Sequence, residues 1–270
     1  VNTPPYSNIE NSNWADSLLS KMSIEEKIGQ LFMVAANGKY LNEDYYQKVD
    51  SLILNYKIGG LIFFQSGPIE LQNLLKRYNS ISEIPLLSGI DAEWGAAMRL
   101  DSVQNFPWMM TLGAIQDDDL IYDFGVQVAE QLNQLGLHIN FAPVVDINNN
   151  PLNPIIDRRS FGSDKKLVAS KGLSYMKALQ DNRVLACAKH FPGHGDTDTD
   201  SHKSLPMIYH DYTRLDSVEL FPFKKLINQG LGAIMMAHIN LPNIDTSGVP
   251  SSFSHHLIGD ILKKEIGFQG

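Results

Sequence analysis

Cysteine is almost absent from this sequence: Cys187 is the only one in 270 residues. A single cysteine cannot form a disulfide within the chain, so it indicates nothing about the redox compartment. Cys187 lies in the apolar run VLACAKHF, residues 184–191, where a thiol usually packs as a small hydrophobic side chain. We therefore expect a buried cysteine rather than a nucleophile.

Long apolar runs and an excess of positive charge are missing as well. No run reaches the length of about 18 apolar residues that predicts a membrane-spanning helix. The formal net charge of −8 leaves no basic face that would neutralise nucleic-acid phosphates. With 43% hydrophobic residues, the composition is typical of a soluble globular protein with a sizeable core.

The polar start of the chain at Val1 fits either a processed secreted protein or an arbitrary boundary. It favours the periplasm or the exterior over the cytoplasm without deciding the compartment. The oligomeric state has no signal in the sequence.

Nucleotide-binding glycine motifs are also absent, since neither GxGxxG nor GxxxxGK[ST] occurs. What the sequence does contain is an alternation of short apolar runs with longer helical patterns. Near-continuous apolar runs suit parallel strands that are buried on both faces. They span residues 29–35, 58–64, 84–91, 137–146, 184–191 and 232–239.

Helical segments with recognisable ends lie between these runs. Ser23 and Glu26 have the spacing of a capping box. Further helices are predicted over residues 117–136, 164–182, 211–230 and 254–267, and Pro222 should kink or split the third. Repeated strand–helix units with short connections predict an α/β fold with a parallel sheet. We favour a (β/α)8 TIM-type barrel over a doubly wound sheet.

In such a barrel the chemistry lies on the loops that follow the carboxyl ends of the strands. The polar segments of this sequence fall there. They are DAEWGAAMR after the third run, DINNNPLNP and DRRSFG after the fourth, KHFPGHGDTDTDSH after the fifth and HINLPNIDTSGVP after the sixth. Burying charged side chains at the ends of apolar strands costs free energy unless the charges are paired or take part in function. We therefore expect the functional site at this end of the barrel.

The crowded segment 189–202 raises the question of a metal site. His190 and His194 have the spacing of a helical zinc pair, but Pro192 and Gly193 prevent a helix between them. The sequence therefore argues against zinc.

Calcium and serine chemistry are disfavoured in the same segment. The run DTDTD at 196–200 resembles a calcium loop, but Ser201 replaces its turn glycine and Met207 its bidentate glutamate. Ser201 and Ser204 lie outside any Gly-x-Ser-x-Gly elbow.

Acid–base chemistry fits the segment better. His202 follows Asp200 by two residues, and a carboxylate beside an imidazole fixes its tautomer and raises its pKa, which suits proton donation near neutral pH. A solvated turn is the alternative. The position of Asp200 and His202 on a loop that follows a barrel strand favours the catalytic interpretation.

Other charged residues mark the same end of the barrel. Lys189 and His190 end the fifth run, and we expect at least one of them to point into the barrel mouth. The alternative for Lys189 is a purely structural pair with a local carboxylate. Asp91 and Arg99 flank the third loop, and of the two arginines in DRRSFG we expect one to remain a surface charge.

These motifs together carry a resemblance. KHFPGHGDTDTDSH, DAEWGAAMRL, NFAPVVDINNNP and RRSFG resemble the N-terminal barrel domain of glycoside hydrolase family 3, and more narrowly its β-N-acetylhexosaminidase branch. The similarity extends from MSIEEKIGQLFM to IGFQG, which implies one catalytic barrel domain over residues 1–270.

The resemblance implies roles for seven residues. His202 would be the general acid/base and Asp200 its partner. The pocket for the terminal N-acetylglucosamine would be formed by Asp91, Arg99, Arg159, Lys189 and His190. Trp94 and Ala96 depart from the commoner D-x-E-G-G-R pattern, which predicts a narrower pocket or an altered leaving-group side. No metal or organic cofactor is implied.

The nucleophile is the main departure from the family pattern. Retaining glycosidases use a nucleophilic carboxylate beside the acid/base, and the family's aspartate follows GF-x-G at the end of the next strand. This sequence ends at Gly270 within IGFQG, so the resemblance places the nucleophile after residue 270. Asp245 is the nearest alternative, and we expect it to shape a loop. The barrel would be truncated before its last strands, and the chain alone should be inactive.

Three alternatives to a β-N-acetylhexosaminidase acting on glycans or muropeptides remain open at this point. The protein could be another family 3 enzyme, such as a β-glucosidase. It could be a phosphorylase, because a histidine dyad tolerates an incoming phosphate better than a carboxylate would. It could also be a sugar-binding barrel without catalysis.

Overall fold

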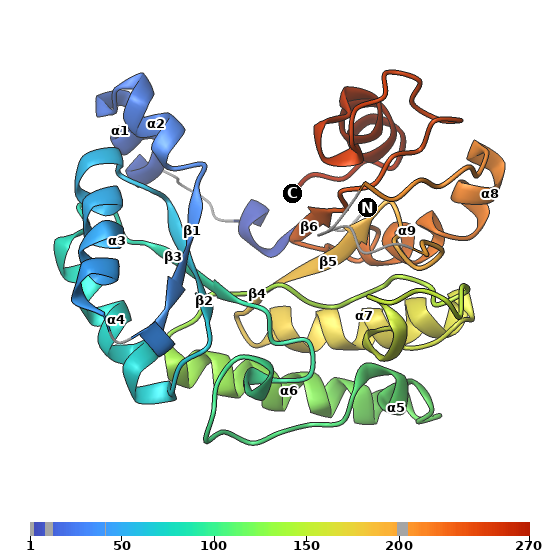
Figure 1. The fold of residues 1–270 in the computed structure, drawn as a ribbon, viewed down its shortest axis with the longest axis horizontal. Helices are drawn as coiled ribbons and strands as arrows, with labels where there is room; N and C mark the ends of the chain where they lie inside the picture. Colours follow the sequence, from blue (N-terminus) through green and yellow to red (C-terminus); the bar gives the residue numbers. More distant parts are fainter. Residues whose placement is uncertain (1–2, 9–12, 41, 199–204) are drawn as a thin grey trace.

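A computed structural model describes residues 3–8, 13–40, 42–198 and 205–270. Six parallel strands form one curved sheet in the order of the chain (Figure 1). Their bounds are β1 (Met33–Asn37), β2 (Gly60–Phe64), β3 (Leu87–Ile90), β4 (Ile139–Asn140), β5 (Leu185–Phe191) and β6 (Ala233–Met236). β1 and β6 are the two edges, so these strands make an open TIM-barrel-like sheet, as predicted, and not a closed barrel.

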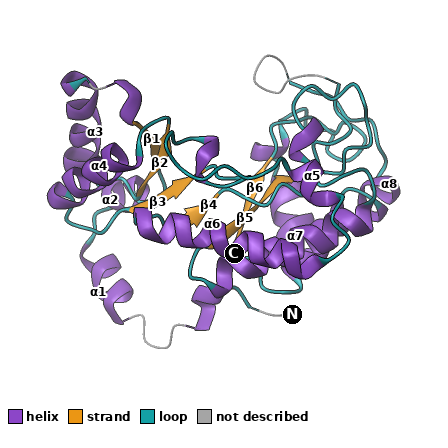
Figure 2. Cartoon of the chain, turned by 90° about the horizontal axis from the view of Figure 1, so that it is seen from below, coloured by secondary structure: helices purple, strands orange, loops and turns teal. Residues whose placement is uncertain are grey.

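Helices surround the sheet on its outer side (Figure 2). The α-helices are α1 (Asn13–Lys21), α2 (Ile24–Gly29), α3 (Glu43–Tyr56), α4 (Pro68–Ile81), α5 (Met109–Gly113), α6 (Asp118–Leu135), α7 (Lys165–Asp181), α8 (Tyr212–Ser217) and α9 (Leu220–Ile227). Shorter or non-α turns are η1 (Pro5–Asn8), η2 (Gly38–Tyr40), η3 (Ala96–Met98), η4 (Asp157–Arg159), η5 (Ser251–Phe253) and the π-type helix η6 (His256–Glu265). None of the described helices has both the length and the apolar character needed to cross a membrane.

Each observed strand is shorter than its predicted run, and two of them differ from the prediction substantially. The first begins at Met33 and not at residue 29, because Gly29 ends α2 and Gln30 caps it. The fourth is reduced to Ile139–Asn140, since Pro143 has no N–H to donate. The chain nevertheless continues beside β5, where Val145 N donates to Lys189 O at 2.8 Å.

The helix predictions agree closely with the structure. The capping box is present: Glu26 N donates to Ser23 Oγ at 3.2 Å and Ser23 N to the Glu26 carboxylate at 2.9 Å. The segment predicted to be disrupted by Pro222 is split into α8 and α9, and the break falls at Val218 and Glu219. A proline ring clashes with the carbonyl four residues earlier, which here is Val218. The position of the break therefore follows from Pro222.

The core lies between the sheet and its helices. α6 and α7 pack closely because Gly125 leaves room for the partner helix: a Cβ there would lie 2.5 Å from the Ala178 Cβ. The apolar faces of α6, α7 and α9 are buried against each other and the sheet. This packing leaves the carboxyl ends of β1 to β6 at one common edge, where the polar loops meet.

Candidate active site at the carboxyl ends of the strands

A cavity of about 450 Å³ lies where the loops after β3, β4, β5 and β6 meet. We call it the inner pocket. Its polar lining residues are Asp91, Glu93, Arg99, Arg159, Lys189, His190, His194 and His238. All five residues predicted to bind substrate therefore lie around one cavity, although they come from the loop after β3, the loop after β4 and the end of β5.

Lys189 is the centre of a buried charge network. Its Nζ lies 2.9 Å from Asp91 Oδ1 and 2.7 Å from Glu93 Oε1, and its side chain is 2% exposed. Arg159 binds Glu93 through two parallel bonds, Nε to Oε2 at 2.9 Å and Nη2 to Oε1 at 2.7 Å. Arg99 Nη2 donates to Asp91 Oδ2 at 2.8 Å. Three cations thus surround two carboxylates, and the pocket has an excess of hydrogen-bond donors.

The network keeps both carboxylates ionised. Burial by itself would raise the pKa of Glu93, but Lys189 and Arg159 lower that pKa to about 2. Burial would likewise raise the pKa of Asp91, but Lys189 and Arg99 outweigh burial, and the net shift of that pKa is downward. Neither group can serve as a proton donor near neutral pH. Their role is to hold the cations in place and to accept hydrogen bonds.

Glu93 was missed by the sequence analysis, although it lies in the quoted motif DAEWGAAMR. Its side chain is fully buried and touches both Arg159 and Lys189. The available signal was the second carboxylate two residues after Asp91, followed by the mostly apolar segment 94–98. Its partners are distant in the sequence, since Arg159 lies 66 positions after Glu93.

His190 is held by a second buried carboxylate, Asp146, which was also missed. The His190 Nδ1 lies 2.7 Å from Asp146 Oδ2, and the backbone N–H groups of His190 and His194 donate to the same carboxylate. Burial raises the pKa of Asp146, but His190 outweighs it and the net shift is downward. Burial lowers the pKa of His190 more than Asp146 raises it. A neutral His190 that donates from Nδ1 leaves Nε2 as an acceptor for a hydroxyl group.

His190 and His194, whose spacing raised the question of a zinc pair, bind separate partners. Their ring centroids are 5.8 Å apart, and each Nδ1 has another partner. The His194 Nδ1 lies 2.8 Å from Thr197 Oγ1. Thr197 is buried in turn, which anchors the start of the loop after β5. The two imidazoles therefore act on separate partners.

The two arginines of DRRSFG divide as expected. Arg159 enters the inner pocket, whereas the Arg158 side chain is 60% exposed and lies over the Trp108 ring at 4.7 Å. Trp94 stacks against Trp108 with 4.1 Å between centroids. Neither Trp94 nor Ala96 is among the described residues that line the inner pocket, so they do not narrow it directly. An altered leaving-group side stays a prediction.

Asp200 and His202, the predicted acid/base pair, lie outside the described residues. The chain on both sides of them is anchored. Before them, Asp196 Oδ2 lies 2.6 Å from His210 Nε2. After them, Asn240 N donates to Pro206 O at 2.8 Å and Ile208 N to Asn240 O at 2.9 Å.

Of the described residues, Asp196, His210 and Glu219 form the one group with spacing suited to a metal ion. Arg214 already occupies its centre, with Nη2 2.9 Å from Glu219 Oε1 and 3.7 Å from Asp196 Oδ2. A guanidinium in this position opposes a second cation. We interpret the group as an anchor for the loop.

Two other groups considered as nucleophiles are engaged elsewhere. Burial raises the pKa of Cys187 to about 12, which keeps the thiol protonated. Asp245 accepts from Ser247 N at 2.9 Å and from the Ser254 hydroxyl. It shapes the loop after β6 and does not line the inner pocket.

Comparison with known families identifies one match that covers most of the chain. The model of the glycosyl hydrolase family 3 N-terminal domain matches residues 23–270. Beta-hexosaminidase A of Pseudoalteromonas piscicida is 37% identical over 247 residues, which are 83% of this chain and 41% of that protein. The chain thus spans less than half the length of this relative.

Solved structures give the same relationship. A family 3 beta-N-acetylglucosaminidase from Paenibacillus sp. str. FPU-7 has a TM-score of 0.86 and 38% identity, over 92% of this chain and 48% of that one. NagZ from Neisseria gonorrhoeae in complex with N-trifluoroacetyl-D-glucosamine has a TM-score of 0.78 and 30% identity, over 88% of this chain and 71% of that one.

Proposed function

Because this chain belongs to glycosyl hydrolase family 3 as its N-terminal domain, we propose that the protein is a retaining glycoside hydrolase that removes terminal β-linked N-acetylhexosamine, chiefly N-acetylglucosamine. The observation that carries the proposal is the inner pocket. Its lining combines fixed donors on Lys189, Arg159 and Arg99 with carboxylate acceptors on Asp91 and Glu93.

A sugar ring matches this chemistry. Each hydroxyl donates one hydrogen bond and accepts others, so it can bridge a carboxylate and a cation. Asp91 and Lys189 lie 2.9 Å apart and present such a pair. The neutral His190 adds an acceptor at Nε2. The names of the similar proteins support N-acetylglucosamine as the sugar. That a glycan or muropeptide carries it is part of the proposal.

The chemical step is proposed to need groups at opposite faces of the sugar. His202, oriented by Asp200, would protonate the leaving oxygen and then take a proton from water. The nucleophile would be an aspartate encoded after residue 270, which attacks the anomeric carbon and forms a glycosyl–enzyme intermediate. An imidazolium donor avoids a second anion beside this nucleophile. The step uses no metal or organic cofactor.

The first experiment compares substrates on the full-length protein. We expect hydrolysis of an aryl β-N-acetylglucosaminide well above that of the aryl β-glucoside, with no acceleration by added phosphate. Lys189→Met should lower kcat/KM by about 10- to 100-fold, since it removes a charged hydrogen-bond donor. Preference for the glucoside would indicate a β-glucosidase, and acceleration by phosphate a phosphorylase.

The second experiment tests the acid/base assignment. His202→Ala should slow an aryl substrate with a poor leaving group more than one with a good leaving group, because a good leaving group needs little protonation. Equal losses on both substrates would contradict the role of His202. A third experiment uses the 270-residue chain alone, which should bind N-acetylglucosamine but not turn over the aryl glycoside. If the full-length protein also bound the sugar without turnover, the protein would be a non-catalytic sugar-binding barrel.

A further inference from the structure

His194 is a histidine of the inner pocket to which no ligand-binding role has been assigned. The residue lines the cavity beside His190 and is 3% exposed. Its Nδ1 contacts Thr197, but its Nε2 has no hydrogen-bond partner among the described residues. Buried polar atoms in folded proteins are nearly always paired. A bare ring nitrogen in the wall of a cavity therefore points to a partner that the ligand supplies.

The backbone around His194 is fixed against the loop after β4. His194 N donates to Asp146 Oδ1 at 2.7 Å, which places the residue beside the strand end. The next residue, Gly195, lies so close to Ile147 that a Cβ there would be 1.8 Å from the Ile147 carbonyl oxygen. Only glycine fits this contact. The imidazole of His194 is thus held in place from the main-chain side.

The side chain of Asn153 fixes the other side of His194. Its Oδ1 accepts from Ile155 N at 2.9 Å and from Ile156 N at 2.8 Å. Its Nδ2 donates to the His194 carbonyl oxygen at 2.8 Å and to Thr197 Oγ1 at 3.2 Å. The two backbone N–H groups determine which end of the amide is oxygen, so both Nδ2 hydrogens face acceptors. The Asn153 amide is therefore fully used.

Thr197 has one hydroxyl hydrogen and two acceptors within reach. They are the His194 carbonyl oxygen at 3.1 Å and the His194 Nδ1 at 2.8 Å. If the hydroxyl donates to Nδ1, the carbonyl contact has no hydrogen, and Nε2 carries a buried N–H without an acceptor. If it donates to the carbonyl oxygen, Nδ1 carries the hydrogen and donates it to Thr197 Oγ1, which leaves Nε2 as a bare acceptor.

The second arrangement satisfies every hydrogen-bonding group around His194 except Nε2. Thr197 Oγ1 then donates once and accepts twice, from Asn153 Nδ2 and from His194 Nδ1. A buried N–H without an acceptor is also rarer in folded proteins than an acceptor without a donor. We therefore assign the hydrogen of the neutral ring to Nδ1, so that Nε2 accepts.

The inner pocket has few other free acceptors. Each carboxylate oxygen of Asp91 and Glu93 already accepts a hydrogen bond from a lysine or an arginine. A sugar brings several hydroxyl hydrogens and an amide hydrogen, and each of these needs an acceptor once it leaves water. The ring centroids of His190 and His194 are 5.8 Å apart, so a second imidazole acceptor lies next to the first.

We propose that His194 is a sugar-binding residue, whose Nε2 accepts a hydrogen bond from a donor group of the terminal sugar. The inference rests on the proposed function and deepens it, because it adds a residue that selects for a ligand donor at one position. A ligand group with lone pairs only, such as a carboxylate, would face the lone pair of Nε2 and be disfavoured.

The first test compares two substitutions that each keep one half of the imidazole. The amide of His194→Asn reaches the Nδ1 position and can donate to Thr197, but it provides nothing at the Nε2 position. The longer His194→Gln provides an oxygen near the Nε2 position and loses the anchor to Thr197. In calorimetric titration of the full-length protein, the Asn variant should bind N-acetylglucosamine about 3- to 10-fold more weakly than the wild type, and the Gln variant within about 3-fold.

Stability should follow the opposite order. Urea unfolding should show the Asn variant to be more stable than the Gln variant, because only the Asn variant keeps the donor to Thr197. A purely structural His194 would weaken binding most in the least stable variant, and that result would overturn the proposal. The control substitutions His255→Asn and His255→Gln, at the exposed start of η6, should leave the affinity for N-acetylglucosamine unchanged.

The second test reads the tautomer directly. In the 270-residue chain labelled with nitrogen-15 histidine, spectra that correlate ring nitrogens with ring protons distinguish a protonated nitrogen from a bare one. The signal that disappears in His194→Asn belongs to His194. We expect its neutral form to carry the hydrogen on Nδ1. A hydrogen on Nε2 would make this nitrogen a donor and would overturn the assignment.

The third test identifies the sugar group that donates. Deoxy analogues of N-acetylglucosamine at C3, C4 and C6, and 2-deoxyglucose, each lack one donor. The analogue without the group that His194 binds should have equal affinity for the wild type and for His194→Asn, whereas the others should keep the difference. An undiminished difference for all four analogues would show that no sugar donor contacts His194.

Failure of the proposal and failure of the proposed function give different results. Equal affinity of the wild type and His194→Asn for N-acetylglucosamine would overturn the role of His194 and leave the proposed function intact. Failure of the wild-type full-length protein to bind the sugar would contradict the proposed function, and the role of His194 with it.

Discussion

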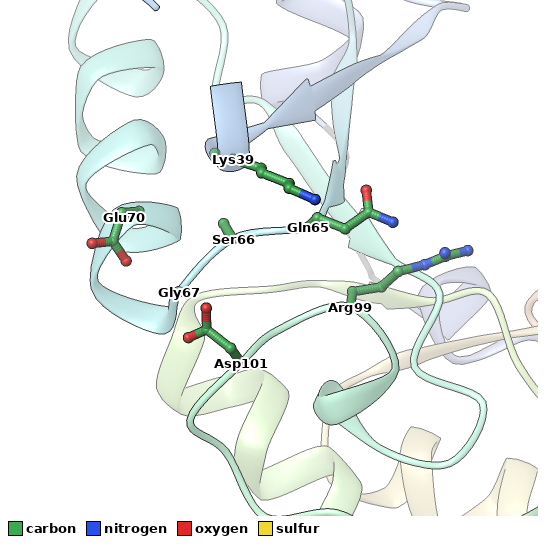
Figure 3. A pocket seen from close by; sticks show the side chains of 8 residues that line it. Lys39, Gln65, Ser66, Gly67, Glu70, Arg99 and Asp101 are labelled. Carbon is green, nitrogen blue, oxygen red and sulfur yellow. The ribbon is translucent and has the colours of Figure 1, made fainter. Parts of the chain in front are cut away.

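The inner pocket and a second cavity beside it, of about 490 Å³ at the carboxyl ends of β1, β2 and β3, hold their charges in opposite ways (Figure 3). We call the second cavity the outer groove, and its polar lining residues are Lys39, Gln65, Ser66, Glu70, Arg99 and Asp101. In the inner pocket Glu93 is fully buried and contacts two cations. In the outer groove Glu70 and Asp101 are exposed and form no ion pair with described residues. The same residue types are thus part of the folded framework in one cavity and solvated in the other.

The difference has a thermodynamic consequence. Removal of one partner from a buried ion pair leaves an uncompensated charge in a medium of low polarity, which is strongly destabilising. Removal of an exposed charge changes little, because water already solvates it. Substitutions in the inner pocket should therefore alter both stability and binding, whereas those in the outer groove should alter stability little.

The largest effect is expected from Glu93→Gln, which leaves Lys189 and Arg159 without their shared carboxylate. We expect the free energy of unfolding to fall by about 3 to 5 kcal/mol in urea titrations. The control is Glu83→Gln, which removes the exposed carboxylate paired with Lys57 and should cost less than about 1 kcal/mol. Similar losses in both variants would remove the distinction between buried and exposed charge.

The second largest effect on stability is expected at low pH, where acid protonates Glu93 in the inner pocket. The pKa of Glu93 is lowered from an ordinary 4.5 to about 2 in the fold, so its contribution is complete above pH 4.5 and is lost as pH falls towards 2. This shift corresponds to about 3 kcal/mol. Urea titrations across that window should show a smaller decline in Glu93→Gln than in the wild type. An unchanged decline would assign the acid sensitivity to other groups.

A third prediction concerns the orientation of His190. Asp146→Asn removes the charge that accepts from His190 Nδ1 and from two backbone N–H groups. It should lower the free energy of unfolding by about 2 kcal/mol and weaken N-acetylglucosamine about 10-fold, because the imidazole loses its fixed tautomer. The exposed Asp119→Asn is the control. Weaker binding without a change in stability would make Asp146 a purely local orienting group.

The smallest effect on stability should come from the outer groove. Lys39→Ala/Gln65→Ala should change the free energy of unfolding by less than about 0.5 kcal/mol, since neither side chain is buried or in an ion pair with a described residue. Thermal and urea unfolding would measure this. A loss above about 2 kcal/mol would mean that the outer groove is structural like the inner pocket.

Local signals were sufficient for most of the fold. The capping box at Ser23, the acidic start of α6 and the apolar strand runs depend on residues close in the sequence, so their patterns predicted the elements. The errors came from the same rules applied incompletely. Pro143 shortens the fourth strand, and Gly29 belongs to a helix end. By contrast, the break predicted from Pro222 is confirmed, and it falls at Val218 and Glu219.

The site was predictable where a polar residue directly ends an apolar strand. Asp91 and Lys189 were found in this way, and the structure joins them across 98 residues of sequence at 2.9 Å. Glu93 and Asp146 were missed because their importance depends on partners from other loops. Burial, which turns a loop carboxylate into the counter-charge of a lysine and an arginine, cannot be read from neighbouring residues.

The sequence by itself determined the order of strands and helices, the loops that carry the charges and the family of the protein. Only the tertiary structure decided which charges neutralise one another and which remain free. Asp91 and Asp101 are alike as residues in one loop, but one lies against Lys189 and the other faces solvent beside Gly67. The physical reason is that chain-local patterns set conformation, whereas the strength of an electrostatic contact depends on distance and solvent access after folding.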